Sequence, residues 1–162
     1  EVADGIHVHP LNTPTYFEKT VRPNVGDSGV QLIVPAFLAP GDTQEERARW
    51  WEMARTQVSF YGSTPNYAFV FEQLGRDGTT ARIREKQKAG DIAGMAAVID
   101  DDLLAHFCTA APWDELADRV VDRYAGTAHR VVSYFTAMDW AQDPTSIGRW
   151  GEVARAVVAR TS

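Results

Sequence analysis

Cysteine is almost absent from this sequence: Cys108 is the single one among 162 residues. One thiol excludes an internal disulfide framework, and it excludes zinc or iron–sulfur sites that need several cysteine ligands. We therefore expect a reducing compartment, the cytoplasm. Cys108 itself we expect to be a small, buried apolar side chain.

Long apolar segments are lacking as well. No run approaches the roughly 20 residues that a membrane-spanning helix needs, and the first residues lack the basic and apolar blocks of a signal peptide. Basic residues number 16 against 22 acidic ones, so the net charge is −6. The basic residues are scattered, and they offer no extended positive field to a phosphate backbone or an anionic lipid surface. We expect neither nucleic acid nor a membrane as a partner.

The residues that are present suffice for one core, because 44% of them are hydrophobic. We expect a single domain over residues 1–162. Apolar segments predict strands at residues 5–9, 30–40 and 130–135. The second is a continuous apolar run, typical of a strand buried on both faces in a parallel sheet. Pro35 cannot donate to a ladder, so we place it near the C-terminal end of that strand.

Helical periodicity occupies the segments between these strands. Thr13 and Pro14 are a typical N-cap and first-position proline for a helix that ends near Val25. Thr43 and Glu46 form a capping box at the start of another helix, which runs to about residue 61. Further helices are predicted from Ser63, Thr64 and Pro65 to Gly75, over residues 91–107 with Asp100, Asp101 and Asp102 as solvated caps at a break, and over residues 111–126 and 146–160.

This order of elements predicts an α/β fold with parallel strands and right-handed crossovers. A helical segment, residues 43–107, separates the second strand from the third. Three strands leave both edges of a sheet unpaired. We therefore expect either a homo-oligomer or completion by a missing N-terminal segment, and the start at Glu1 without a methionine favours an absent upstream part.

Six runs follow one another along the chain: EVADGIHVHPLNTPTYFEKTVRP, VPAFLAPGDTQEERARWW, FYGSTPNYAFVFEQLG, AGDIAGMAAVIDDDLLAHF, PWDELADRVVDRYAG and HRVVSYF. In this order they resemble the C-terminal part of the luciferase-like monooxygenase superfamily, most closely its branch of oxidoreductases that use the deazaflavin coenzyme F420. The resemblance implies the last three βα units of a TIM (β/α)8 barrel, with residues 43–107 carrying extra helices inserted before the last strand. It also implies hydride transfer with coenzyme F420, or with FMN as the alternative, and it assigns no catalytic or cofactor-binding residue.

His7 and His9 lie two residues apart on the first predicted strand, so both imidazoles should point to one face. Metal-dependent amidohydrolases hold a divalent ion with such a pair, but they need further ligands. The other histidines do not fit that role, because His106 falls near a helix end and His129 at the start of a strand. The resemblance instead places His9 at the mouth of a substrate pocket and His7 one layer deeper. An interior histidine pair with no chemical role stays open as the alternative.

The resemblance also implies that Asn12, Phe37, Tyr61 and Tyr67 contact the substrate. Asn12 and Pro35 stand where the sugar-phosphate dehydrogenase of the same branch carries lysines for a phosphate. Neither residue is a cation, so we expect a small substrate without a phosphate group. The aromatic residues would line its pocket, although aromatic side chains at helical spacing are also typical of an ordinary core.

These observations lead to one leading hypothesis and two alternatives. The leading hypothesis is a flavin- or deazaflavin-dependent oxidoreductase, present here as a C-terminal fragment or half-barrel subunit. The first alternative is a catalytically silent half-barrel that oligomerises to cover its sheet. The second is a metal-dependent hydrolase that uses His7 and His9.

Overall fold

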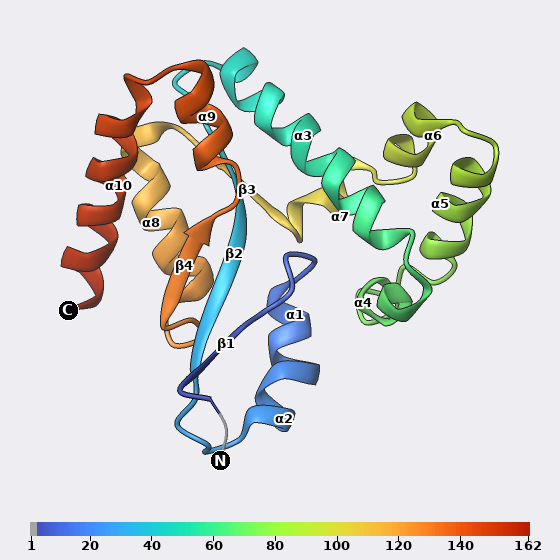
Figure 1. The fold of residues 1–162 in the computed structure, drawn as a ribbon, viewed down its shortest axis with the longest axis horizontal. Helices are drawn as coiled ribbons and strands as arrows, with labels where there is room; N and C mark the ends of the chain where they lie inside the picture. Colours follow the sequence, from blue (N-terminus) through green and yellow to red (C-terminus); the bar gives the residue numbers. More distant parts are fainter. Residues whose placement is uncertain (1–2) are drawn as a thin grey trace. The chain divides into compact units, whose positions relative to one another are not determined.

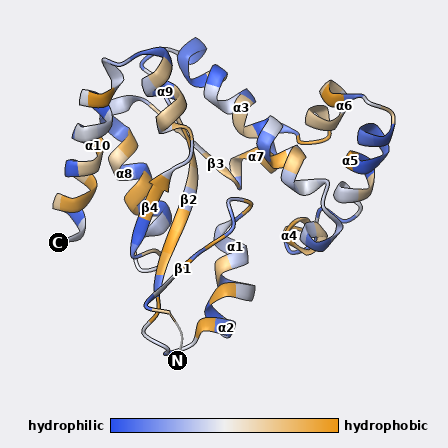
Figure 2. Ribbon diagram, in the orientation of Figure 1, coloured by the Kyte–Doolittle hydropathy of each residue, from blue (hydrophilic) through white to orange (hydrophobic). Residues whose placement is uncertain are grey.

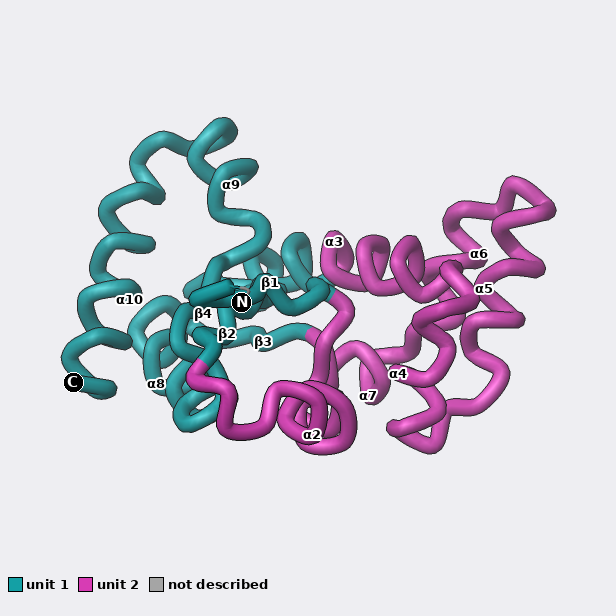
Figure 3. Tube along the Cα trace, turned by 60° about the horizontal axis from the view of Figure 1, so that its bottom comes forward, with its two compact units in different colours: residues 1–10, 30–51, 108–162 teal, residues 11–29, 52–107 magenta. Residues whose placement is uncertain are grey.

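The computed structural model describes residues 3–162, so Glu1 and Val2 at the start of the first quoted run lie outside the described residues. The contacts divide the chain into two compact units (Figure 3). Unit 1 runs to Pro10 and continues over Val30–Trp51 and Cys108–Ser162. Unit 2 comprises Leu11–Gly29 and Glu52–Phe107. All strands of the described chain belong to unit 1, and unit 2 is helical.

A parallel sheet with β2 (Gln31–Pro40) at its centre forms the core of unit 1 (Figure 1). Three strands pair with β2, all of them parallel: β1 (Gly5–His7), β3 (Cys108–Ala111) and β4 (Arg130–Ser133). The predicted α/β class with a parallel sheet is therefore confirmed. The strand β3 was not predicted from the sequence.

The two edges of β2 are used differently. The backbone groups of Gln31, Ile33 and Gly41 bond to β1, to β3 or to residues directly beside them. Those of Leu32 and Ala36 bond to the residues that flank β4. Successive residues of a strand present their backbone groups to opposite edges. Hence β1 and β3 follow one another along one edge of β2, and β4 occupies the other.

Pro35 lies in the middle of β2, so its predicted place near the end of the strand was wrong. On the β1 and β3 edge, pairing with β1 reaches Ile33 and pairing with β3 begins at Phe37. As an odd-numbered residue, Pro35 presents its nitrogen to this edge, in the interval between the two pairings. The missing N–H therefore removes no ladder hydrogen bond, which is the condition under which a strand tolerates proline.

Unit 1 also contains three helices and the first turns of a fourth, α3 (Gln44–Gly62). The amphipathic α8 (Trp113–Tyr124) packs against β3 and α10 (Ser146–Thr161). The short α9 (Thr136–Gln142) follows β4 and was not predicted. Its buried Asp139 accepts a hydrogen bond of 2.7 Å from Nε1 of Trp150, which fixes α9 to α10.

Unit 2 begins with a continuous helical stretch that starts at the predicted N-cap. Oγ1 of Thr13 accepts a hydrogen bond of 3.0 Å from the Tyr16 amide. The stretch consists of α1 (Pro14–Tyr16), a π-helical turn η1 (Phe17–Val21) and α2 (Arg22–Val25). The remaining elements after α3 are η2 (Pro65–Tyr67), α4 (Ala68–Glu72), α5 (Thr79–Lys88), α6 (Ile92–Ala97) and α7 (Asp101–Ala105).

The predicted caps can be checked individually. The capping box of Thr43 and Glu46 is confirmed, because each side chain accepts a hydrogen bond of 3.2 Å from the amide of the other residue. Asp100 caps α7 through a bond of 2.7 Å from the Leu103 amide. Thr64 occupies the N-cap position before Pro65, but its side chain makes no capping bond. Among the described residues, no helix combines the length and the apolar character needed to cross a bilayer.

Candidate functional site

Along the N-terminal half of β2, one face of the sheet in unit 1 is uncovered, and we call this part the open face. Residues paired across parallel strands share a face. The register places His7 and Arg130 beside Ile33, and Val132 beside Pro35. His7 and Arg130 are exposed, Val132 is 46% exposed, and Ile33 and Pro35 are half-buried. The open face thus presents three apolar residues to solvent, flanked by one imidazole and one guanidinium.

The opposite face of β2 is closed. Leu32, Val34, Ala36 and Leu38 point to it, and each is 6% exposed or less. Figure 2 shows β2 as hydrophobic along most of its length, in agreement with the continuous apolar run. Burial on both faces, which the run predicted for the whole strand, holds only for its C-terminal half. The N-terminal half of β2 has apolar residues on a face that nothing in unit 1 buries fully.

The two strand histidines differ in burial. His7 ends β1 and is exposed, whereas His9 is half-buried two residues further on. Burial lowers the pKa of His9 below its ordinary value. Its imidazole is therefore neutral near pH 7, and it can donate one hydrogen bond and accept another. That state suits contact with a polar, uncharged group of a substrate.

A metal centre gains no support from the surroundings of these histidines. In the described part of the chain, no three side chains of His, Cys, Asp or Glu gather closely enough to hold an ion. His129 has a structural role, because its Nδ1 accepts a hydrogen bond of 3.0 Å from the Leu32 amide. Cys108 is buried as predicted, and burial raises the pKa of its thiol to about 12, so it offers no thiolate ligand at neutral pH.

Phe37 lies within a cluster of aromatic rings in unit 1. It is 1% exposed, and its ring centroid is 5.0 Å from that of Tyr134 and 5.5 Å from that of Phe135. Phe135 in turn stacks on Trp50 at 5.9 Å. This packing makes Phe37 part of the hydrophobic core beside the C-terminal half of β2. Its predicted contact with a substrate stays a prediction.

The other predicted aromatic residues lie in unit 2. Tyr61 and Tyr67 are both half-buried, and Tyr61 stacks edge-on against Phe60 with centroids 5.4 Å apart. Burial raises the pKa of Tyr16, and the neighbouring Tyr67 adds to this shift. The Tyr16 ring also lies 5.9 Å from that of Phe69. Tyr16 is a candidate that the sequence analysis missed, because a helix-start position gave no sign that Tyr67 influences the pKa of its hydroxyl.

The six predicted substrate residues are therefore divided between the two units. His7, His9 and Phe37 belong to unit 1, and Asn12, Tyr61 and Tyr67 belong to unit 2. Asn12 is almost fully buried, at 3% exposure, and it carries no charge for a phosphate. A common pocket for all six residues stays a prediction.

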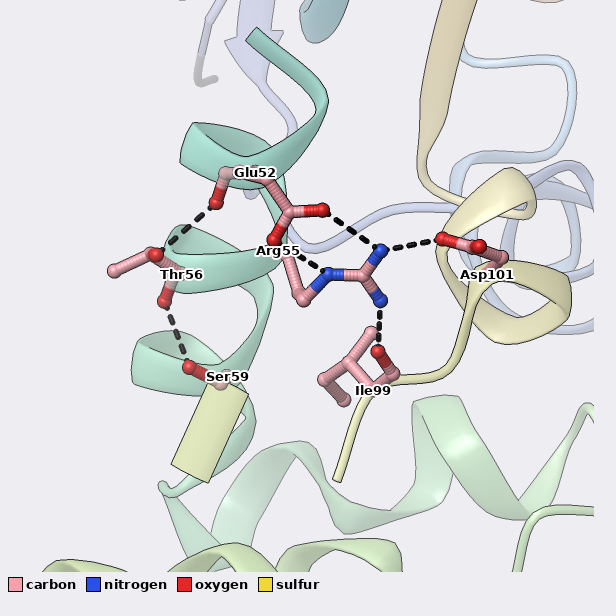
Figure 4. A network of polar contacts seen from close by, with 6 residues as sticks. All are labelled: Glu52, Arg55, Thr56, Ser59, Ile99 and Asp101. Carbon is pink, nitrogen blue, oxygen red and sulfur yellow. Dashed lines mark hydrogen bonds and ion pairs between the residues drawn. The ribbon is translucent and has the colours of Figure 1, made fainter. Parts of the chain in front are cut away.

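A polar network in unit 2 has a structural function rather than a catalytic one. The guanidinium of Arg55 on α3 bonds to the Glu52 carboxylate, to the Asp101 carboxylate and to the carbonyl oxygen of Ile99 (Figure 4). The Arg55 side chain is only 12% exposed. Because its donors are engaged on several sides, Arg55 holds α3 to α7 and to the turn before it.

Comparison with known proteins gives this architecture its class. A model of the luciferase-like monooxygenase family matches residues 1–130, so the chain belongs to that family. Among curated proteins it is similar to one from Mycobacterium bovis and to two from Mycobacterium tuberculosis, each named an uncharacterized protein. Identity is 30% over 146 residues in all three cases, covering 85% of this chain and 43% of each relative. The chain thus spans less than half the length of the curated relatives it matches.

Proposed function

We propose that this chain is the C-terminal portion, about three βα units, of a TIM (β/α)8 barrel in a flavin-type oxidoreductase. The cofactor would be coenzyme F420, with FMN as the alternative, since the luciferase-like family generally uses one or the other. The observation that carries this proposal is the open face of unit 1. In a closed barrel, side chains from the other strands fill the space against every inner face.

The open face supports a barrel because its apolar residues lack a cover. Val132 is 46% exposed on a four-residue strand whose partner residues Ile33 and Pro35 remain half-buried. In the described chain, β1 and β4 each pair with β2 alone, so each has one free edge. Unpaired strand edges and exposed apolar faces are typical sites for pairing and packing with further strands. The curated relatives extend well beyond the matched part, and those additional residues are where such strands would come from.

The residues of the open face, together with His9 beyond the end of β1, fit the substrate side of such a site. A bound deazaflavin or flavin supplies the hydride chemistry, and the protein supplies orientation and exclusion of water. Pro35 and Val132 would present apolar surface to the ring or the substrate. The neutral imidazole of His9 would hold a hydroxyl or carbonyl group of the substrate, donating or accepting one proton in a hydrogen bond. Asn12 and Pro35 provide no cation, which supports a substrate without a phosphate group.

A second candidate function rests on the same open face. A half-barrel can also cover its sheet with a second copy of itself, and it then needs no cofactor. In that case the chain is a silent, oligomerising module. The two candidates differ in whether the protein binds a redox cofactor.

Titration of coenzyme F420 and of FMN distinguishes these candidates. We would determine the mass of the native product, purify that product at its full length, and follow its binding to each cofactor by fluorescence together with its oligomeric state. Saturable F420 binding by a product longer than this chain is the expected result. A native product of this chain's length that forms a folded oligomer and binds neither cofactor would overturn the proposal in favour of the silent module.

A further inference from the structure

Unit 2 has a hollow of about 770 Å³ along α4 and α5. This volume lies in the range of small-molecule sites, about 300–1,000 Å³. Its apolar lining residues are Pro65, Ala68, Ala81 of α5, and Ala89 directly after α5. We propose that this hollow binds a small organic anion with an apolar body. The proposal does not depend on the oxidoreductase assignment, because it uses residues of unit 2 alone.

The N-terminus of α5 provides one half of the anion site. Its N-cap is Gly78, in the left-handed conformation with φ of +74°, which has no side chain to cap the helix. Thr79 turns its own Oγ1 to the Arg76 carbonyl oxygen at 2.7 Å. The first amides of α5 thus lack a side-chain cap, and such a helix end attracts negative charge.

Thr80 adds an independent sign of a missing partner. It lines the hollow and is only 7% exposed. Its Oγ1 is buried and has no hydrogen-bond partner in the structure. A buried hydroxyl without a partner is costly, and an acceptor atom of a ligand would satisfy it once the ligand displaces the side chains that shield this oxygen.

Two cations follow Thr80 at four-residue intervals, so Thr80, Arg84 and Lys88 lie on one stripe of α5. All three line the hollow. Helical side chains lean toward the N-terminus, which directs Arg84 toward the turn of Thr80 and Lys88 toward the turn of Arg84. The Arg84 guanidinium makes one long contact of 3.4 Å to the Ser63 carbonyl oxygen, which leaves capacity among its five N–H donors.

Two carboxylates restrict the kind of anion. Glu72 and Glu85 also line the hollow, and both are exposed. They balance Arg84 and Lys88 in formal charge, so a small multivalent anion gains little from charge alone. A single negative group that reaches the Thr80 end, on a body that covers the alanine and proline walls, avoids this repulsion. Hence the ligand class is a monoanionic carboxylate or sulfonate with an apolar body.

The test uses 8-anilinonaphthalene-1-sulfonate as the probe, titrated into the whole chain. Arg84→Gln combined with Lys88→Gln should weaken its binding by about tenfold, the loss expected for removed charge-assisted hydrogen bonds. The matched control is Lys86→Gln on the same helix, which does not line the hollow and pairs with Asp91 at 3.7 Å. This control should leave binding unchanged. Far-UV circular dichroism verifies that all variants keep their helices.

The location is read separately by NMR of methyl-labelled alanine. Saturating probe should shift the methyl signals of Ala81 and Ala89, and inorganic phosphate at the same concentration should not. Octanoate, a monoanion with an apolar chain, should displace the probe. The proposal is overturned if the double variant binds the probe as tightly as the unchanged protein, if the control loses as much affinity, or if phosphate displaces the probe as well as octanoate does.

Discussion

The two units of this chain differ in where they leave apolar side chains uncovered. Eight large hydrophobic residues of the described chain are exposed, and six of them lie in unit 1: Ile6, Val132, Met138, Trp140, Ile147 and Val158. Unit 2 has Phe60 and Ile92. In unit 1 only Val132 of these six lies on the open face. Ile6 lies on the other face of β1, since it pairs with Leu32, and the remaining four lie on α9 and α10. Incomplete burial is thus more frequent in unit 1 than in unit 2, and it includes both the sheet and the helices beside it.

The largest expected effect comes from removing one buried ring in each unit. Phe135 in unit 1 is 1% exposed, and Phe71 in unit 2 is fully buried beside Phe107, with centroids 5.7 Å apart. Substitution of either by Ala should lower the free energy of unfolding by about 3–5 kcal/mol, through lost contacts and the cavity left behind. Denaturant titration of each variant measures this loss.

The same pair of variants tests whether the units unfold together. All five tryptophans, Trp50, Trp51, Trp113, Trp140 and Trp150, belong to unit 1, so tryptophan fluorescence reports on that unit alone. Far-UV circular dichroism reports the helices of both. If the units unfold separately, Phe71→Ala leaves the fluorescence midpoint in place and shifts part of the dichroism transition. Coincident shifts in both signals would show one cooperative molecule and would remove the contrast in stability between the units.

A smaller effect is expected when Arg55 is replaced by Ala. The change removes the bonds to Glu52, Asp101 and Ile99, and it leaves the carbonyl of Ile99 without this donor. The carboxylates are 63% and 77% exposed, so water screens much of the ionic attraction. We expect a loss of about 2 kcal/mol in the dichroism transition, mainly from hydrogen bonds to the charged group.

The control for Arg55 is another arginine of unit 2. Arg22 pairs with Glu18 at 3.3 Å, and both side chains are more than half exposed. Arg22→Ala should cost about 0.5 kcal/mol or less, as for other surface pairs on a helix. Equal losses for the two variants would mean that burial of the Arg55 guanidinium contributes nothing.

The sequence predicted helix starts well where the capping residue and the backbone it caps are close in the chain. The N-cap of Thr13, the capping box of Thr43 and Glu46, and the Asp100 cap were readable, because each depends on side chains within a few residues of the backbone they satisfy. By contrast, β3 was missed. Its residues, CTAA, carry no apolar periodicity, and they form a strand because β2 offers them a free edge beyond the end of β1.

The candidate site was less predictable than the fold. Spacing identified His7 and His9 as a pair, but not that His9 is the more buried of the two. Nor did it show that Phe37 and Phe135 stack, or that Asn12 and Phe37 belong to different units. Burial and division into units depend on contacts between residues far apart in the chain. A periodic pattern identifies the buried side of an element without saying what lies against it.

The smallest expected effect tests the open face itself. Val132→Thr keeps the shape of the side chain and its β-branching, so the strand propensity of β4 is preserved. With Val132 46% exposed in this chain, the change should alter the free energy of unfolding by about 0.5 kcal/mol or less. The matched control is Val34→Thr on the closed face of the neighbouring strand, where the residue is fully buried. An added hydroxyl there should cost about 1–3 kcal/mol.

The outcome of this comparison depends on what covers the face in solution. If further strands or a second copy lie over it, Val132→Thr becomes as costly as Val34→Thr, because the hydroxyl then enters a dry interior without a partner. Measuring both variants in the 162-residue chain and in the full-length native product separates these states. A small effect in the short chain with a large one in the longer product places the missing strands over Val132. A large effect in the short chain at high concentration alone indicates self-association through the open face.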